Sequence, residues 1–173
     1  MGAVDDVVLF KKDYQKGHRL CEVVQNPKIE NIIDANIDNQ IMFLGYDVVK
    51  DDIAKEKILH LICYWKRTGE LRSPLGLFIQ FLGADKQNGF VKNCVFGYRV
   101  YPPESLPRDQ VIGVHHYILL PSDMKTGSYS MRTGLFSLED GEILSVSDKA
   151  KTDNLGRIVL GDILIGQGGI LEN

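Results

Sequence analysis

The stretch VIGVHHYILLPSDMKTGSYSMRTGLFSLEDGE, which runs from Val111 to Glu142, predicts two long β-strands joined by a turn. In the first strand, successive side chains point to opposite faces, so residues two apart share a face. The more apolar face of this strand carries Ile112, Val114, His116, Ile118 and Leu120. Pro121 lacks an amide donor and cannot extend a central ladder, so the strand should end at Leu120.

The second strand of the stretch alternates in the same way and has one aromatic and aliphatic face. This face carries Tyr129, Met131, Thr133 and Leu135. Ser122, Asp123, Thr126 and Gly127 supply turn chemistry before this strand, and Glu139, Asp140 and Gly141 supply it afterwards. We therefore predict that the chain turns back after the first strand, so that the two strands form a hairpin.

Alternating segments recur through most of the remaining sequence. They predict strands over residues 41–48, 57–66, 75–82, 90–101, 143–146 and 157–165. The strand at 57–66 is apolar on both faces, which predicts a central position in a sheet. One face of this strand carries Leu59, Leu61, Cys63 and Trp65.

Short strands, turns rich in Gly, Pro, Asp and Asn, and the lack of a 3.6-residue period predict an all-β protein. We expect an antiparallel two-sheet β-sandwich, immunoglobulin-like or jelly-roll-like as in carbohydrate-binding modules, with about eight strands. A closed barrel with a central cavity is the competing architecture. We assign an irregular lead-in with one or two edge strands to residues 1–40, the sandwich to 41–166 and a flexible tail to 167–173.

Length and composition limit the class of protein. A chain of 173 residues with 44% hydrophobic composition can bury roughly 70% of its unfolded surface in one core. The net charge of −3 and the scattered Lys and Arg residues argue against a nucleic-acid surface. The sequence contains neither a membrane-spanning apolar run nor a signal pattern, so we expect the chain as given to be soluble.

The three cysteines are an odd set without metal-ligand spacing. Cys21, Cys63 and Cys94 therefore predict neither a zinc site nor a disulfide framework, although one bridge plus a free thiol stays open. Cys63 fits best as a small apolar core residue. Cysteine usage leaves the compartment undecided.

Five segments of the chain follow one another in a recognisable order: FLGYDV (43–48), LHLICYWK (59–66), LFIQFLGADKQNG (77–89), ILLPSDMKTGSYSMRTGLFSLEDGEIL (118–144) and IVLGDILI (158–165). Together they resemble the β-sandwich domain of large bacterial membrane proteins of the dolichyl-phosphate-mannose mannosyltransferase-like class. The family tends to carry an acidic or histidine-containing segment where this chain reads VFGYRVYPPESLPRD. The resemblance therefore leaves any ligand role of that segment in doubt.

The resemblance implies a module without the transferase chemistry, which would reside in a membrane portion outside this chain. Such a module would face the extracytoplasmic side and would bind glycan. The chain is also similar in layout to the polysaccharide-recognition domain of some export-transporter ATPases. That second resemblance implies a cytoplasmic module, where free cysteines are expected.

We assign no catalytic residues and no metal ligands. His115 and His116 are adjacent on a strand and point to opposite faces, so they cannot chelate one ion together. His116 should be a hydrogen-bonded core residue and His115 should be exposed. The available carboxylates lie almost entirely in predicted turns, and they leave open a structural calcium ion: Asp123, Glu139, Asp140, Glu142 and Asp162.

Glycan binding by a sandwich usually relies on aromatic faces with polar groups at the rim. Trp65 should be a core residue between the sheets, which leaves the tyrosines as surface candidates. The predicted ligand-binding residues are Tyr98, Tyr101 and Tyr117, with Arg99 and Arg132 as rim donors. We hypothesise an accessory module of a cell-envelope glycosylation or polysaccharide protein; a small-ligand barrel and a plain interaction domain are the alternatives.

Overall fold

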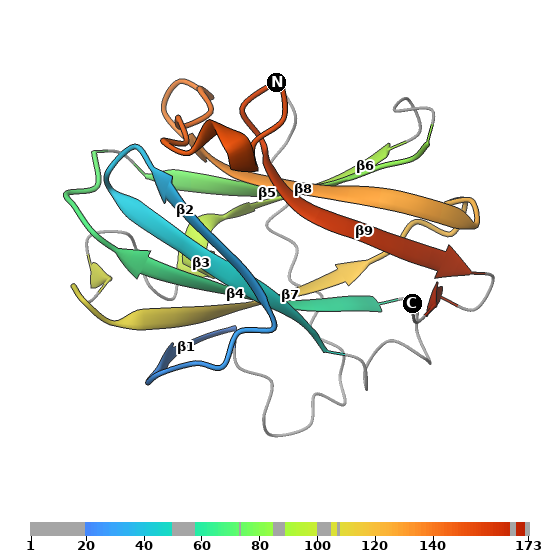
Figure 1. Ribbon diagram of the computed structural model, residues 1–173, viewed down its shortest axis with the longest axis horizontal. Coiled ribbons are helices and arrows are strands. Elements are labelled where there is room, and N and C mark those ends of the chain that lie inside the picture. The colour runs from blue at the N-terminus through green and yellow to red at the C-terminus, as the bar shows by residue number, and fades with distance from the viewer. Residues whose placement is uncertain are drawn as a thin grey trace.

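The computed structural model describes residues 20–49, 58–72, 74–84, 89–99, 105–106, 108–166 and 169–171, which form ten β-strands in two layers (Figure 1). The first sheet contains β1 (Cys21–Val24), β2 (Asn31–Ile37), β3 (Ile41–Val49), β4 (Ile58–Arg67) and β7 (Val111–Leu119). The second sheet contains β5 (Leu75–Leu82), β6 (Gly89–Val95), β8 (Gly127–Ser137), β9 (Ile158–Gly166) and β10 (Gly169–Leu171). Short 3-10 turns, η1 (Phe96–Arg99) and η3 (Lys149–Lys151), complete the regular structure.

The strands lie in the order β1-β7-β4-β3-β2 in the first sheet and β10-β9-β8-β5-β6 in the second. Every pairing of neighbouring strands is antiparallel. The predicted all-β, two-sheet antiparallel sandwich is therefore confirmed, and the two sheets are separate rather than joined in a closed barrel. β4 occupies the centre of its sheet, as its two apolar faces predict. Among the described residues, no helix has the length and apolar character needed to cross a bilayer.

The two strands of the 111–142 stretch belong to different sheets. β7 pairs with β1 and β4, whereas β8 pairs with β5 and β9. The predicted hairpin is therefore wrong, and the turn after Leu120 carries the chain from the first sheet to the second. The alternation of a strand identifies the side that faces the core, but it does not identify the sheet to which the strand belongs. The inner face of either sheet buries the same kind of side chains.

The core lies between the sheets and is built from the side chains that alternation assigned to it. The predicted inner face of β4 is completely buried, and Trp65 contacts Phe43 and Phe96 with ring centroids 4.4 and 5.3 Å apart. Phe43 belongs to β3 and Phe96 follows β6, so the single tryptophan contacts groups from both sheets. The prediction of a core tryptophan is confirmed.

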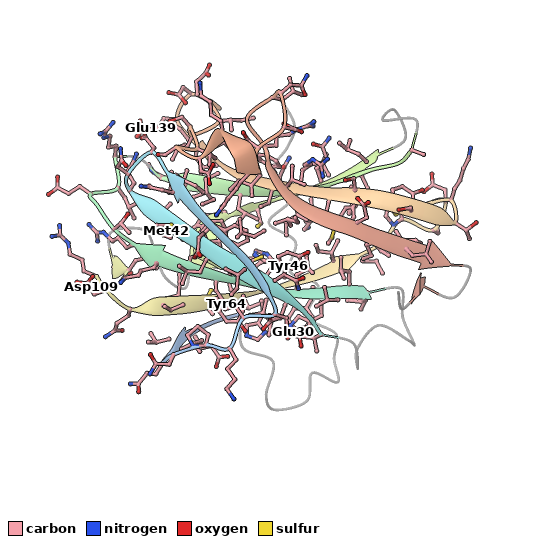
Figure 2. The ribbon with its side chains drawn as sticks, viewed as in Figure 1. Glu30, Met42, Tyr46, Tyr64, Asp109 and Glu139 are labelled. Atoms are coloured by element: carbon pink, nitrogen blue, oxygen red, sulfur yellow. The ribbon has the colours of Figure 1, made fainter. Side chains whose placement is uncertain are left out.

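β3 departs from simple alternation. A β-bulge shifts its register against β4 between Phe43 and Gly45, so both Phe43 and Tyr46 face the core. Tyr46 reaches across the interior and donates its hydroxyl proton to the carbonyl oxygen of Leu160 in β9 at 2.7 Å (Figure 2). This buried hydrogen bond ties one sheet to the other.

β2 forms the outer edge of the first sheet and is irregular in its middle. Its register against β3 shifts between Ile32 and Ala35, and Asp34 takes a positive φ of 54°. The ammonium group of Lys151, on η3, donates to the carbonyl oxygens of Ile33 and Asp34. The backbone of this edge is thus bent, and part of it is capped by a side chain.

Three element boundaries differ from the sequence prediction. The strand expected at 90–101 ends at Val95, because Gly97 and Tyr98 take the left-handed φ values of 63° and 50° that leave the β region. The strand expected at 143–146 is absent: this segment lies in the connection between β8 and β9 of the second sheet and makes only isolated bridges, to Phe136 and to Ile37 of β2. A flexible tail was predicted at 167–173, but residues 169–171 pair with β9 as β10.

Candidate functional site

The tripeptide Gly-Leu-Phe occurs twice, at 76–78 in β5 and at 134–136 in β8. The two copies pair in antiparallel register, so that Gly76 lies opposite Phe136 and Phe78 lies opposite Gly134. The two leucines face the core, and both phenylalanines lie on the outer face of the second sheet. Each ring therefore faces a glycine on the neighbouring strand.

The two rings lie flat against the sheet because the glycines have no side chains. A Cβ atom added at Gly76 would lie 2.2 Å from the Phe136 ring, and one added at Gly134 would lie 2.7 Å from the Phe78 ring. Phe78 is 7% exposed and Phe136 is half-buried. The outer face thus carries an aromatic surface whose accessible part is Phe136.

Polar side chains continue this surface along the same two strands. The next outward pair after Gly134 and Phe78 is Arg132 on β8 and Gln80 on β5, and Asn93 of β6 lies beside Phe78. Arg132 donates from Nη1 to Ser130 Oγ at 2.6 Å and to the carbonyl oxygen of Met131 at 2.8 Å. Its guanidinium is thereby held close to the sheet surface.

The loop before β9 adds an ion-pair network to this face. Asp153 Oδ2 lies 2.8 Å from Arg157 Nε and 2.6 Å from Arg157 Nη2, while Arg157 Nη1 donates to Gln80 Oε1 at 2.6 Å. Arg132 Nε lies 3.5 Å from the same Asp153 oxygen without forming a hydrogen bond. Two guanidinium groups therefore share one carboxylate.

The pKa of Asp153 lies below its ordinary value, so the carboxyl group is ionised at physiological pH. Burial on its own would raise the pKa of this carboxyl group, but hydrogen bonds from the Arg157 side chain and from the backbone amides of Arg157 and Leu155 outweigh burial and lower it. The network is thus a fixed arrangement of charges. We call the outward surface formed by Phe78, Phe136, Asn93, Gln80, Arg132, Asp153 and Arg157 the GLF face.

The residues predicted to bind ligand are not brought together. Arg132 belongs to the GLF face, whereas Tyr117 points outward from β7 in the opposite sheet. The side chain of Arg99 and all of Tyr101 lie outside the described residues. Tyr98 packs against the core and its hydroxyl group lies 2.8 Å from His116 Nδ1, so its ring is not an open stacking surface.

Tyr117 lies beside two histidines on the outer face of the first sheet. Its ring stacks on His60 at a centroid distance of 4.1 Å, and His60 Nε2 lies 3.0 Å from His115 Nδ1. His115 Nε2 is 3.4 Å from Glu22 Oε1. The side chain of His115 is only 12% exposed, so the prediction of an exposed His115 is wrong: its neighbours on β1 and β4 cover it.

His116 is a hydrogen-bonded core residue, as predicted. It is 1% exposed, and its Nδ1 atom shares a hydrogen bond with the Tyr98 hydroxyl group. Burial, with smaller contributions from His115 and His60, lowers the pKa of His116 to about 3. The imidazole is therefore neutral at physiological pH.

The three cysteines are free thiols. Cys63 is fully buried between the sheets, which confirms its assignment as a core residue. Burial, with a smaller contribution from Cys94, raises the pKa of Cys21 to about 12. The thiol of Cys21 donates to the carbonyl oxygen of Gly97 at 3.3 Å, which links β1 to η1.

The carboxylates considered for calcium are dispersed over the surface. Glu139, Asp140 and Glu142 line a shallow cleft of about 440 Å³ at the end of the sandwich, and Figure 2 shows Glu139 near the turn between β2 and β3. Asp123 and Asp162 are exposed elsewhere on the surface. Among the described residues, no group of three or more His, Cys, Asp or Glu side chains could hold a metal ion. Calcium binding stays a prediction.

Comparisons with models of known protein families and with curated proteins find no match for this chain. The assignment of the GLF face as a candidate site therefore rests on its geometry and not on a related protein. Sequence reasoning missed this face, although the repeated Gly-Leu-Phe tripeptide was a visible signal. The repeat becomes informative once β5 and β8 are known to pair in the register that sets each glycine against a phenylalanine.

Proposed function

We propose that the chain is a non-catalytic β-sandwich accessory module of a cell-envelope glycosylation or polysaccharide-handling protein, and that it binds carbohydrate on the GLF face. The observation that supports this proposal most strongly is the paired Gly-Leu-Phe arrangement, which lays two aromatic rings flat on an outer sheet surface. A flat ring complements the apolar face of a sugar ring.

Planar polar groups beside the rings complete the requirements for such a site. Hydroxyl groups of a sugar need donors and acceptors held at fixed positions, and Arg132, Gln80 and Asn93 lie within one residue pair of Phe78. Asn93 forms no hydrogen bond through its side chain within the described part of the chain. Its amide group is therefore available to a ligand.

Substitution of the accessible ring tests this proposal. Envelope polysaccharides are titrated against the protein by calorimetry, and the Phe136→Ala variant should lose affinity by about tenfold or more, as expected for an aromatic anchor. Leu119→Ala is the matched control, because Leu119 is a 56% exposed apolar residue on the opposite sheet. Equal affinities of the two variants, or the absence of binding to any polysaccharide, would contradict the proposal.

The free thiols favour a second candidate within the same class, the polysaccharide-recognition domain of an exporter ATPase. Three free cysteines suit a reducing cytosol better than an oxidising envelope. Copurification of a nucleotide-hydrolysing partner with the full-length protein would support this candidate. Copurification of a multi-pass membrane portion would support the first.

A further inference from the structure

The charges on the GLF face do not balance locally, and the imbalance lies at Arg132. Oδ2 of Asp153 accepts a hydrogen bond from Arg157 Nε and lies 2.6 Å from Arg157 Nη2, and Oδ1 accepts hydrogen bonds from the backbone amides of Leu155 and Arg157. Both carboxylate oxygens are therefore engaged by the loop itself. Arg132 Nε remains at 3.5 Å from Oδ2, buried and without a hydrogen bond.

A buried guanidinium donor without a hydrogen-bond partner is unusual and costs free energy. The hydrogen bonds that Arg132 does form go to a neutral hydroxyl group and a neutral carbonyl oxygen, so its charge is offset by the Asp153 carboxylate, which it shares with Arg157. The side chain is 16% exposed, and so a ligand can still reach it. The Nε atom itself is closed to solvent, so an anionic group that arrives from outside would pair with the exposed part of the guanidinium group.

We propose that the polysaccharide bound by the GLF face is acidic, and that its anionic group pairs with Arg132 while a sugar ring lies on Phe136. This inference rests on the proposed carbohydrate function and adds the charge class of the ligand. The chain as a whole has a net charge of −3, so general attraction to a polyanion does not account for such binding. The local positive charge of the Arg132 guanidinium group does account for it.

One other carboxylate lies close to this position. Asp162 of β9 is opposite Ser130, the residue whose hydroxyl group accepts from Arg132, and its side chain is exposed. Asp162 forms no ion pair within the described part of the chain. Its charge should repel an anionic ligand at Arg132, so it provides a second substitution with the opposite expected sign.

Pairs of polymers that share a sugar backbone and differ in charge separate the effect of ligand charge on affinity from the effect of sugar shape. Polygalacturonate and its methyl ester share one backbone and differ in charge, and dextran sulfate and dextran provide the same comparison for a sulfate ester. Wild-type protein should bind one charged polymer about tenfold or more tightly than its neutral partner, which corresponds to one well-formed charged contact. The pair that shows the larger preference for its charged member identifies whether the anionic group is a carboxylate or a sulfate.

Two variants test whether Arg132 is responsible. Arg132→Gln should abolish the preference for the charged polymer, because it should weaken binding of the charged polymer more than binding of its neutral partner, whereas Asp162→Asn should increase the preference several-fold. Thermal unfolding followed by Trp65 fluorescence verifies that each variant is folded, and Asp162→Asn, at an exposed position, provides a result even if Arg132→Gln does not fold.

The possible outcomes separate the two proposals. Wild-type binding to a neutral polymer that equals or exceeds binding to its charged partner overturns the acidic ligand and leaves the carbohydrate function standing. A charge preference that survives in Arg132→Gln overturns the role of Arg132. Binding to neither member of either pair counts against the acidic ligand and against the carbohydrate function together.

Discussion

At the scale of single residues, burial decides the chemistry of the histidines and the tyrosines. His116 and Tyr98 form a hydrogen bond in the interior, and the pKa of His116 falls to about 3 because its charged form would be poorly solvated there. The alternation of β7 predicted the buried position of His116 correctly. It gave no hint of Tyr98 as its partner, because Tyr98 reaches this position through a left-handed turn rather than through a strand.

The low pKa of His116 should make stability depend on pH. Between pH 3 and 6.5 the unfolded state binds the proton and the folded state does not, so the free energy of unfolding should fall as pH is lowered. Between pH 6.5 and 5 the wild type should lose about 2 kcal/mol more than His116→Gln, since each pH unit contributes about 1.4 kcal/mol. Urea denaturation at several pH values measures this difference. Parallel pH profiles of the two proteins would show that His116 is protonated in the folded state.

At the scale of secondary-structure elements, the GLF face depends on the pairing of β5 with β8. Alternation correctly predicted that Leu77 and Leu135 face the core, which places the flanking Gly and Phe residues on the outside. The contact between each ring and a glycine requires the register of two strands that are far apart in the sequence. The site could not be predicted from the sequence, because the hairpin interpretation gave β8 the wrong partner.

The two glycines under the rings should respond differently to substitution. In Gly134→Ala the new methyl group would meet the buried Phe78 ring, and the crowding should cost about 1–3 kcal/mol. In Gly76→Ala it would meet Phe136, which can swing into solvent, so the loss of stability should be smaller. Chemical denaturation measures both changes, with Ser128→Ala, at an exposed position on β8, as a control expected within about 0.5 kcal/mol of wild type.

Gly76→Ala should also weaken polysaccharide binding, because the displaced Phe136 ring no longer lies flat on the sheet. A variant that keeps wild-type stability and wild-type affinity would show that the ring does not depend on the glycine beneath it. If Gly134→Ala were as stable as the wild type, the Phe78 ring could move away from the new methyl group without cost. That result would contradict the predicted crowding.

At the scale of the whole molecule, the chain passes between the sheets after β4, after β6 and after β7, and both sheets contribute to one core. Composition and strand pattern were sufficient to predict the sandwich, because any set of short amphipathic strands must bury its apolar faces against each other. The order of strands within each sheet was not predictable, since it depends on long-range pairing that no local pattern encodes.

A shared core predicts a single cooperative unfolding transition. Trp65 contacts Phe43 and Phe96, so its fluorescence reports the contact between the sheets, whereas far-ultraviolet circular dichroism reports the strands themselves. The two signals should give the same midpoint in a denaturant titration. Separate midpoints would show that one sheet unfolds before the other, and Trp65→Phe, which removes the only tryptophan, verifies the origin of the fluorescence signal.

The bent outer edge of the first sheet has a consequence for crowded environments. A straight edge strand offers free amides and carbonyls on which a strand of another molecule can pair, which is the first step towards fibrils. The bulge in β2 and the ammonium group of Lys151 on its carbonyl oxygens interrupt that row of groups. Many copies of this sandwich can therefore lie close together without this edge seeding their polymerisation.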